Sequence, residues 1–256
     1  MLSPCTDLDE MTPRAIVQAA LSAGLDIIAI CDHNSARNVS AAMRAAENTS
    51  LVVIPGIEVT SSEEVHVVGL FPDEAGTTGM QEEIYSRLRG QNNEDVFGYQ
   101  VVVDEFDMVE DLDQRLLIGA TTLSTERVVE LIHHFDGMAI ASHVDRKGFG
   151  IFSQLGFIPD DLELDALEIS RHVDEQGLRQ RFPHCGDRPL ITSSDAHYLR
   201  DIGAARTVAR LKEPTVAELS RALWDKVAVA LWNSEGLRPK HRKSAVTPRM
   251  GLPAPS

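Results

Sequence analysis

The sequence predicts a parallel α/β fold, and two observations carry that prediction. Several stretches repeat one rhythm, in which an apolar run of strand length is followed by a polar turn and then by a segment with helical periodicity. The chain also has 256 residues, of which 43% are hydrophobic and 25% are charged. That length and composition allow a sizeable core in one large domain or two small ones.

The first predicted element is a helix that begins at Pro13. Thr12 can cap this helix, and proline is favoured at the first helical position. Apolar residues at helical spacing continue until Gly24, which ends the helix, and a buried strand over residues 25–31 follows directly. This order, helix and then strand, sets the rhythm for the rest of the chain.

Further strands are predicted wherever a short apolar run is bounded by turn residues. They cover residues 51–54, 65–71, 138–142, 166–170, 189–193 and 227–231. Two more helices have their own start signals. Ser124 is a cap for a helix that continues through Ile132, and Thr215 with Glu218 forms a capping box before a helix over residues 219–224.

Two segments break the rhythm. Residues 73–122 are acidic and contain glycine, and we expect them to be an insertion over one face, with residues 97–103 and 116–120 paired as a hairpin. Residues 233–256 hold four prolines and five Arg or Lys against one Glu, which predicts a basic, disordered tail. The predicted organisation is therefore one domain, 1–232, followed by this tail.

Charge and composition narrow the partners. The net charge is −15 and the tail carries +4, so residues 1–232 carry −19. Affinity for duplex nucleic acid comes from Lys and Arg that neutralise phosphates, so this charge argues against such a partner. A small anionic substrate is still compatible if metal ions supply positive charge locally.

The same reading argues against a membrane or secreted protein. No apolar run reaches the ~18 residues of a membrane helix, and no signal peptide pattern opens the chain. Three widely spaced cysteines, Cys5, Cys31 and Cys185, do not make a disulfide framework and fit a reducing compartment. We therefore expect a soluble, cytoplasmic protein without a membrane partner.

Acidic and imidazole side chains gather where the predicted strands end. They are Asp32 and His33 after the 25–31 strand, Glu58 beyond 51–54, His143 after 138–142, and Asp195 and His197 beyond 189–193. Because the carboxyl ends of parallel strands meet on one face of a barrel, these residues are expected to converge. His66 lies near the start of a predicted strand, so strand geometry alone does not bring it there.

These residue types indicate a metal site. Imidazole and carboxylate without cysteine suit zinc, manganese or iron, and a carboxylate such as Glu58 can bridge two cations. Two metals roughly 3.5–4 Å apart would lower the pKa of a bridging water and generate hydroxide near neutral pH. Each pair of residues is weak evidence alone, because Asp-X-His arises by chance. Their shared position at strand ends is what points to hydrolytic chemistry.

Five stretches, in this order along the chain, resemble one family of enzymes. They are residues 24–34, 55–59, 64–68, 141–143 and 194–197. The family is that of the polymerase and histidinol phosphatase (PHP) phosphoesterases. The resemblance implies a distorted seven-stranded, TIM-like (β/α) barrel with two or three divalent metal ions. It makes metal ligands of six residues, with Asp32 beside them: His33, Glu58, His66, His143, Asp195 and His197.

The chain departs from this family at its start. Members open with an Asp-Leu-His-X-His strand that binds metal, whereas this chain has no histidine before His33 and begins like the loop after that strand. Without its first strand, a barrel would leave two neighbouring strands with unpaired edges. We therefore expect the native start to lie roughly 10–15 residues upstream, the length of one strand and its flanks. The rival is a true truncation with weak or absent turnover.

The leading functional hypothesis is a metal-dependent phosphoesterase. A metal-bridging hydroxide would attack the phosphoryl group in line, while Asp32 or His197 helps to protonate the leaving oxygen. The resemblance leaves nucleotides, short oligonucleotides and sugar or amino-alcohol phosphates as small substrates. Arg146 and Arg171 could bind the phosphate, although solvated surface charge explains both equally well.

Two alternatives stay open. One is a metal-binding or regulatory barrel with impaired catalysis, which would hold metal without turnover. The other is a metal hydrolase of amide or lactone bonds, because the same Lewis-acid chemistry activates water against carbonyl groups.

Overall fold

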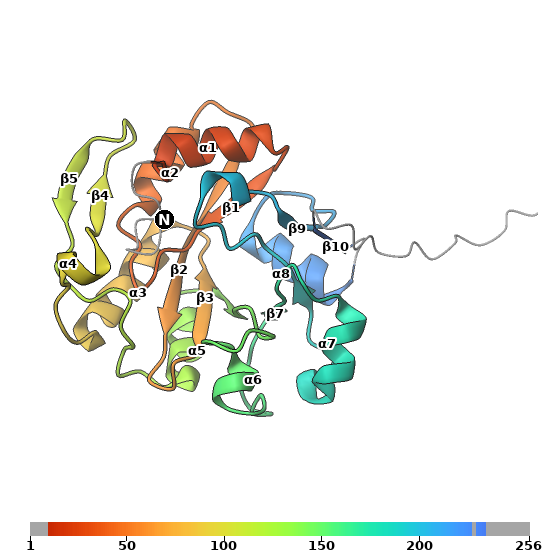
Figure 1. The fold of residues 1–256 in the computed structure, drawn as a ribbon. Helices are drawn as coiled ribbons and strands as arrows, with labels where there is room; N and C mark the ends of the chain where they lie inside the picture. Colours follow the sequence, from red (N-terminus) through yellow and green to blue (C-terminus); the bar gives the residue numbers. More distant parts are fainter. Residues whose placement is uncertain (1–9, 227–228, 234–256) are drawn as a thin grey trace, which may run out of the picture.

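A six-stranded sheet, curled into a half-barrel, forms the centre of the molecule (Figure 1). This computed structural model describes residues 10–226 and 229–233. In spatial order the strands are β1 (Ile27–Ile30), β2 (Val52–Thr60), β3 (His66–Leu70), β6 (Met138–Ala141), β7 (Ala166–Glu168) and β8 (Leu190–Ile191). The predicted α/β class is confirmed, with strands and helices alternating along most of the chain.

The strand directions differ from the prediction at β3. β1 and β2 are parallel, as are β6, β7 and β8, but β3 runs antiparallel to both β2 and β6. A parallel connection needs a crossover of a dozen or more residues, whereas only residues 61–65 join β2 to β3, so a hairpin forms instead. The start of β3 therefore lies at the edge of the sheet where its neighbours end.

The three predicted cap residues are confirmed, but the capping box is wrong in one half: the Glu218 carboxylate accepts from the Lys212 N–H, and the Thr215 N–H donates to the Glu213 carbonyl. The side chains of Thr12, Ser124 and Thr215 each accept a hydrogen bond from a backbone N–H in the first turn of a helix. The longer helices are α1 (Pro13–Ser22), α2 (Val39–Ala46), α3 (Glu74–Arg87), α5 (Thr125–His134) and α8 (Val216–Trp224). The shorter ones are α4 (Glu94–Phe97), α6 (Ile151–Gln154), α7 (Glu175–Arg181), η1 (Pro183–Cys185) and η2 (Leu199–Asp201). Among the described residues, no helix is long and apolar enough to cross a membrane.

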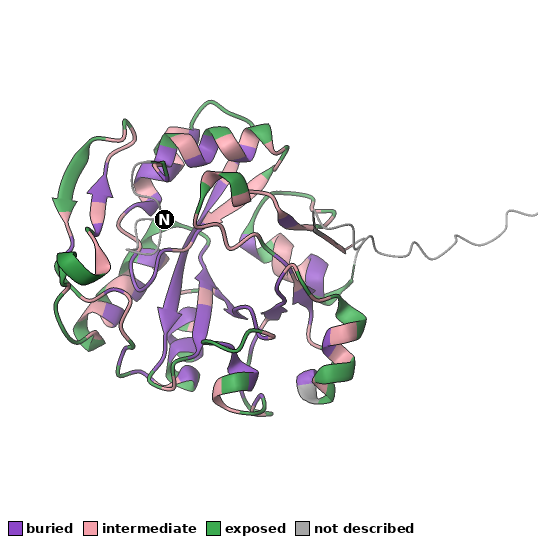
Figure 2. Ribbon diagram, viewed as in Figure 1, coloured by how far each residue is buried: buried purple, intermediate pink, exposed green. Residues whose placement is uncertain are grey.

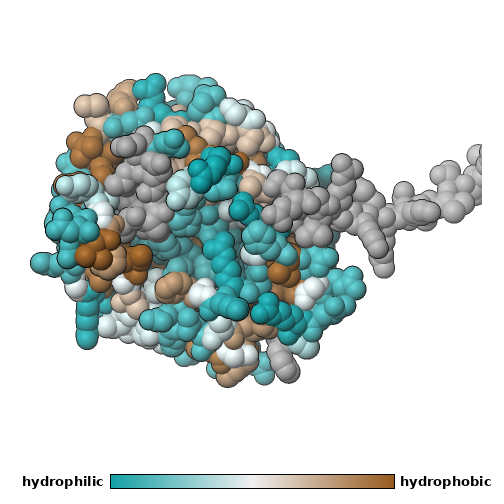
Figure 3. Space-filling view, viewed as in Figure 1, coloured by the Kyte–Doolittle hydropathy of each residue, from teal (hydrophilic) through white to brown (hydrophobic). Residues whose placement is uncertain are grey.

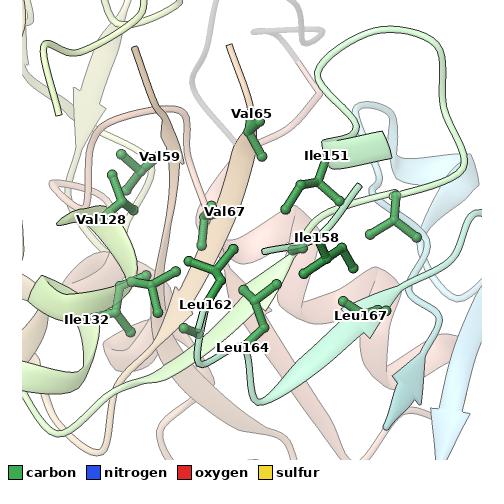
Figure 4. Close-up of a cluster of buried hydrophobic side chains, with 14 of the residues drawn as sticks. Val59, Val65, Val67, Val128, Ile132, Ile151, Ile158, Leu162, Leu164 and Leu167 are labelled. Atoms are coloured by element: carbon green, nitrogen blue, oxygen red, sulfur yellow. The ribbon is translucent and has the colours of Figure 1, made fainter. Parts of the chain in front are cut away.

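Most residues of β2, β3, β6 and β7 are buried, and Figure 2 draws β2 and β3 largely in purple. On one face Val59, Val67 and Leu167 belong to the same apolar cluster as Val128 and Ile132 of α5 (Figure 4). On the opposite face, side chains such as Ile54 and Ile140 pack with residues of α8. Because side chains alternate along a strand, Glu58 shares this second face with Ile54. The face is thus apolar under α8 and polar at its carboxyl edge.

The segment predicted as an insertion is partly integrated into the domain. Met80 and Ile84 of α3 are fully buried in the main apolar cluster, whereas β4 (Val101–Val103) and β5 (Val109–Leu112) form a separate antiparallel pair. The predicted hairpin partner, residues 116–120, is wrong, because the carbonyls of Leu117 and Gly119 instead accept hydrogen bonds from the Asn34 amide. Figure 3 shows hydrophobic side chains on the side of the molecule where Figure 1 draws the β4–β5 pair.

The end of the described chain adds a strand pair that the sequence did not predict in full. β9 (Ala205–Val208) pairs antiparallel with β10 (Ala230–Asn233), and only the second lies near the predicted 227–231 strand. Residues 227–228 and the predicted tail beyond residue 233 lie outside the described residues. The predictions about the chain start concern positions before residue 10, which are also outside them.

Candidate metal centre

Glu58 lies near the carboxyl end of β2. Residues 32–34, which follow β1, lie beside Glu58 and bond to its backbone. The backbone N–H of Glu58 donates to the Asp32 carbonyl at 3.0 Å, and the N–H of Asn34 donates to the Glu58 carbonyl at 2.7 Å. These two bonds extend the β1–β2 ladder past the end of β1 and make His33 the partner of Glu58. Backbone pairing thus places an imidazole beside a carboxylate.

Asn34 holds the segment after β1 in place. Its φ of 51° is left-handed, a conformation that asparagine tolerates better than most residues. Its amide donates to the carbonyls of Leu117 and Gly119, each at 2.8 Å, and its side-chain oxygen accepts from the Thr60 N–H at 3.1 Å. With no exposed surface and three hydrogen bonds, Asn34 fixes the position of His33.

His66 and His143 approach Glu58 from the next two strands. His66 opens β3 opposite Thr60, so the antiparallel direction of β3 brings it to the same edge as Glu58. His143 follows β6 with a left-handed φ of 29°, and the N–H of the preceding Ser142 donates to the His66 carbonyl at 3.0 Å. Three strand ends and one strand start therefore converge.

The cluster is compact and buried. Glu58 Oε2 lies 3.2 Å from His33 Nδ1, and Glu58 Oε1 lies 3.2 Å from His66 Nδ1 and 3.6 Å from His143 Nε2. None of the four residues is more than 7% exposed. Candidate ligand atoms of His33, Glu58 and His66 all lie within 4.8 Å of one another, the spacing of atoms around a shared cation.

The electrostatics of the cluster fit a bound cation. Burial alone would raise the pKa of Glu58, but contacts with His143, His33 and His66 hold it well below its usual value, so the carboxylate is charged. Within the described chain, His143 Nδ1 is buried and makes no hydrogen bond, and His66 Nδ1 makes none beyond its 3.2 Å ion-pair contact with Glu58 Oε1. Buried polar atoms without such partners are uncommon, and nitrogen and carboxylate donors are the set that zinc, manganese and iron prefer. The residues present therefore fit a divalent metal.

Asp195 and His197 lie on the segment after β8 and are more exposed than the cluster. Their side chains are 16% and 25% exposed, and the His197 ring centroid is 6.2 Å from that of His33. The Asp195 carboxylate pairs with Arg146, with Nη1 to Oδ2 at 2.6 Å. The structure thus brings His197 beside the cluster and joins Asp195 to a predicted substrate-binding residue.

The two remaining predicted site residues, Asp32 and Arg171, lie in different surroundings. Asp32 is 3% exposed, adjoins His33, and accepts a long 3.4 Å hydrogen bond from Asn38. Arg171 Nη1 lies 3.4 Å from Asp201 Oδ1, and Asp201 is not a predicted site residue. Asp32 therefore lies beside the cluster, next to His33 in the chain, and Arg171 lies beside Asp201 on the segment after β8.

Glu168 is a site residue that sequence reasoning missed. It ends β7 and accepts a hydrogen bond from Ser193. Its pKa is raised to about 7, chiefly by burial and also by Asp195 and Glu58, against the opposing effects of Ser193 and His143. Its run, Ala166 to Ser170, was interpreted only as an apolar strand. A carboxylate at the inward-facing end of such a strand was the signal that could have identified it.

The comparisons confirm the resemblance to PHP proteins. The PHP-associated family model matches residues 185–225, which include Asp195 and His197. A 5′-3′ exoribonuclease of Haemophilus influenzae is 30% identical over 63 residues, which are 23% of this chain and 23% of the relative. The match to this relative is therefore local, and the chain covers less than a quarter of its length.

Solved structures share the fold over most of this chain. Endonuclease Q of Pyrococcus furiosus, named as lesion-specific, has a TM-score of 0.64 and 16% identity, covering 86% of this chain and 53% of its own. A putative metal-dependent phosphoesterase from Bifidobacterium adolescentis has a TM-score of 0.52 and 19% identity, covering 84% of this chain and 91% of its own. The chain therefore spans about half of endonuclease Q and most of the second protein.

One expectation is overturned by these comparisons. The net charge was taken to argue against duplex nucleic acid as a partner, yet endonuclease Q was solved with a 27-mer duplex that carries an abasic lesion, and that structure matches 89% of this chain with 15% identity and a TM-score of 0.64. The argument was wrong because net charge is a sum over the chain, whereas binding depends on the local field. Residues 94–113 alone contain eight acidic and no basic residues, so much of the negative charge lies in the α4–β5 segment.

Proposed function

From the match to the PHP-associated family and the shared fold, we propose that this chain is a metal-dependent phosphoesterase acting on nucleotides or oligonucleotides. The observation that carries the proposal is one buried carboxylate, Glu58, whose two oxygens each lie 3.2 Å from a different histidine. The exoribonuclease and endonuclease names of the relatives support this substrate class over sugar and amino-alcohol phosphates.

The proposed ligands of two or three divalent ions are the four cluster residues, His33, Glu58, His66 and His143, joined by Asp195 and His197. When bound, such ions polarise a phosphoryl oxygen and make water nucleophilic near neutral pH. The protein holds the donors in place before any ion arrives, because strand pairing and the Asn34 hydrogen bonds fix their backbone.

Arg146, Asp32 and His197 serve the substrate in this proposal. Arg146 lies at the site through its contact with Asp195, and its guanidinium can bind a phosphate in two-point fashion. His197 Nδ1 lies 2.9 Å from the Asp195 carbonyl oxygen, so an Nδ1–H donated there leaves Nε2 to bind a metal or to move a proton. Asp32, buried beside His33, is the second candidate to protonate the leaving oxygen.

The same proposal includes the fold and the domain limits. The six-stranded half-barrel would be the larger part of a distorted seven-stranded barrel, spanning residues 1–232 with its insertion at about 73–122. β1 supports this, because within the described chain it pairs with a strand on one side only.

The test is a metal titration combined with turnover. Metal-free protein should bind Mn²⁺ or Zn²⁺ and then hydrolyse bis(p-nitrophenyl) phosphate and short oligonucleotides. Glu58→Gln should abolish both properties, whereas Glu130→Gln, on the exposed surface of α5, should change neither. Metal binding without turnover would replace the proposal by the regulatory alternative. Cleavage of lactones or amides but not phosphoesters would favour the carbonyl hydrolase.

A further inference from the structure

An exposed aromatic ring lies directly against the metal cluster. Phe149 stacks on His66, with ring centroids 4.3 Å apart and an interplanar angle of 17°. Despite this contact, Phe149 remains 39% exposed to solvent. Phe149 belongs to residues 145–150, the part of the connection between β6 and α6 that follows His143 and that also carries Arg146 and Lys147. We call this segment the β6–α6 loop.

The backbone of the β6–α6 loop is held firmly around Phe149. The Phe149 carbonyl accepts from the His66 N–H at 3.0 Å, and the Arg146 N–H donates to the His143 carbonyl at 2.9 Å. A Cβ on Gly150 would come within 2.6 Å of the Arg146 carbonyl oxygen, so only glycine fits the loop there. These contacts tie the loop to two of the proposed ligands and fix where Phe149 lies.

Phe149 adopts a conformation that a bulky residue rarely takes. Its φ of 59° is left-handed, which is unfavourable for an aromatic side chain and is found mainly where surrounding structure imposes it. Packing alone does not account for this strain, because the ring is only partly buried. A strained, exposed aromatic beside a cluster of candidate ligands points to a role in binding.

We propose that Phe149 is a specificity-determining residue, a shelf on which a flat aromatic group of the substrate stacks. The inference rests on the proposed function and identifies the aromatic group with a nucleobase. His66 covers one face of the ring, and Phe149 still keeps 39% of its surface exposed. Apart from its chain neighbours, no atom of the described residues lies within 4 Å of a Cβ placed on Gly148, so the adjoining position is open. Arg146 of the same loop lies at the site, where a phosphate would be bound.

Tyr198 is the other exposed aromatic residue next to a proposed ligand, and it suits this role less well. The Arg200 guanidinium lies 4.3 Å from the centroid of its ring, so one face of Tyr198 already has a cationic partner. Stacking on Phe149 would depend little on base identity, because every base presents a π-face. The shelf therefore distinguishes nucleotides from aliphatic phosphates rather than one base from another.

The test compares two ligands that differ only in the base. Calorimetry on the metal-loaded protein should give AMP about tenfold higher affinity than ribose 5-phosphate, as expected for one stacked base. Phe149→Ala should remove that preference by weakening AMP alone, and Phe149→Trp should retain it. Phe157→Ala, which removes a 55% exposed phenylalanine from the α6–β7 segment, is the matched control and should change neither affinity.

The possible failures are separable. Metal content is measured on each variant, because loss of Phe149 could also disturb His66. If Phe149→Ala binds less metal and its affinities for AMP and ribose 5-phosphate fall equally, Phe149 only supports His66 and the inference is overturned. Equal affinity of the wild type for AMP and ribose 5-phosphate, with phosphoester turnover intact, would overturn the inference and leave the proposed function standing. Absence of metal binding and of turnover in the wild type would overturn both.

Discussion

The two halves of the candidate site are built differently. One half is the strand-held cluster of His33, Glu58, His66 and His143, which lies at ends of paired strands and is almost wholly buried. The other is the loop-held pair of Asp195 and His197, which follows the two-residue strand β8 and is partly exposed. Backbone ladders position the first half, and side-chain contacts position the second.

This difference has an electrostatic counterpart. In the strand-held cluster, a charged, buried Glu58 faces imidazoles, an arrangement that a divalent cation would stabilise because a buried charge needs a partner. In the loop-held pair, Asp195 already has a cation, the Arg146 guanidinium at 2.6 Å. We therefore expect a metal to bind first at the strand-held cluster, and Asp195 to join only when Arg146 releases it.

The largest expected effect separates the two halves directly. His66→Ala removes a donor from the strand-held cluster and should lower metal affinity by at least a hundredfold, since even residues behind a metal ligand contribute tenfold or more. His197→Ala should lower the affinity for the first metal by about tenfold or less. A competition titration against a chromophoric chelator measures both variants. Equal losses would show that the two halves bind metal as one unit.

The second prediction concerns how the strand-held cluster is positioned. Asn34→Gly keeps the left-handed φ accessible but removes three buried hydrogen bonds, so unfolding free energy should fall by about 2 kcal/mol. Metal affinity should fall with it, because His33 is no longer held beside Glu58. Asn48→Gly is the control, since Asn48 has a φ of 63° on an exposed turn. Urea denaturation measures the unfolding free energy of both variants. A similar decrease in Asn34→Gly and Asn48→Gly would refute the role assigned to Asn34.

Sequence reasoning predicted the features of this molecule that depend on local signals. The caps Thr12, Ser124 and Thr215 are recognisable because capping involves neighbours within one turn. Polar residues at the ends of apolar runs likewise identified Glu58 and His143, because strand ends share an edge. These parts of the fold and the site follow from short-range chemistry.

Features that depend on pairing between distant segments were not predictable in the same way. The direction of β3, which places His66 in the cluster, depends on its hydrogen bonds to β2 and β6 rather than on its own sequence. For the same reason the role of Asn34 was not predicted and the pairing of residues 116–120 was predicted wrongly, since the two segments that bond to each other lie more than eighty residues apart. Glu168 was missed because its carboxylate becomes a site residue only when β7 adjoins β6 and β8.

The third prediction concerns Arg146, whose guanidinium pairs with Asp195 of the loop-held pair. Arg146→Ala frees the Asp195 carboxylate and removes a phosphate-binding group, so KM for a phosphoester should rise about tenfold while the bound metal is not reduced. Arg171→Ala, which removes a guanidinium paired with Asp201, should change KM less than threefold. Steady-state kinetics with metal analysis measure both. If Arg146→Ala loses metal instead, Arg146 supports the site rather than the substrate.

The smallest expected effect lies at the opposite edge of the sheet, where β6 begins and the chain enters β7. His133 Nε2 lies 2.9 Å from Asp165 Oδ2, and the hydrogen bond to Asp165 raises the pKa of His133 although burial opposes it. A raised folded-state pKa means that the pair stabilises the protein fully below the unfolded pKa of about 6.5 and stops doing so as pH rises through the folded value.

His133→Asn should therefore destabilise the metal-free protein more at pH 5.5 than at pH 8.5, by less than about 1 kcal/mol because the pair is partly solvated. His134→Asn, at an exposed neighbouring position, should show no such difference. Denaturation at the two pH values measures the effect. Since this edge carries no residue of the strand-held cluster or the loop-held pair, adding metal near pH 7 should leave the difference between His133→Asn and the wild type unchanged. A change on adding metal would mean that the two edges of the sheet are coupled, and the site could then no longer be treated as two independent halves at one edge.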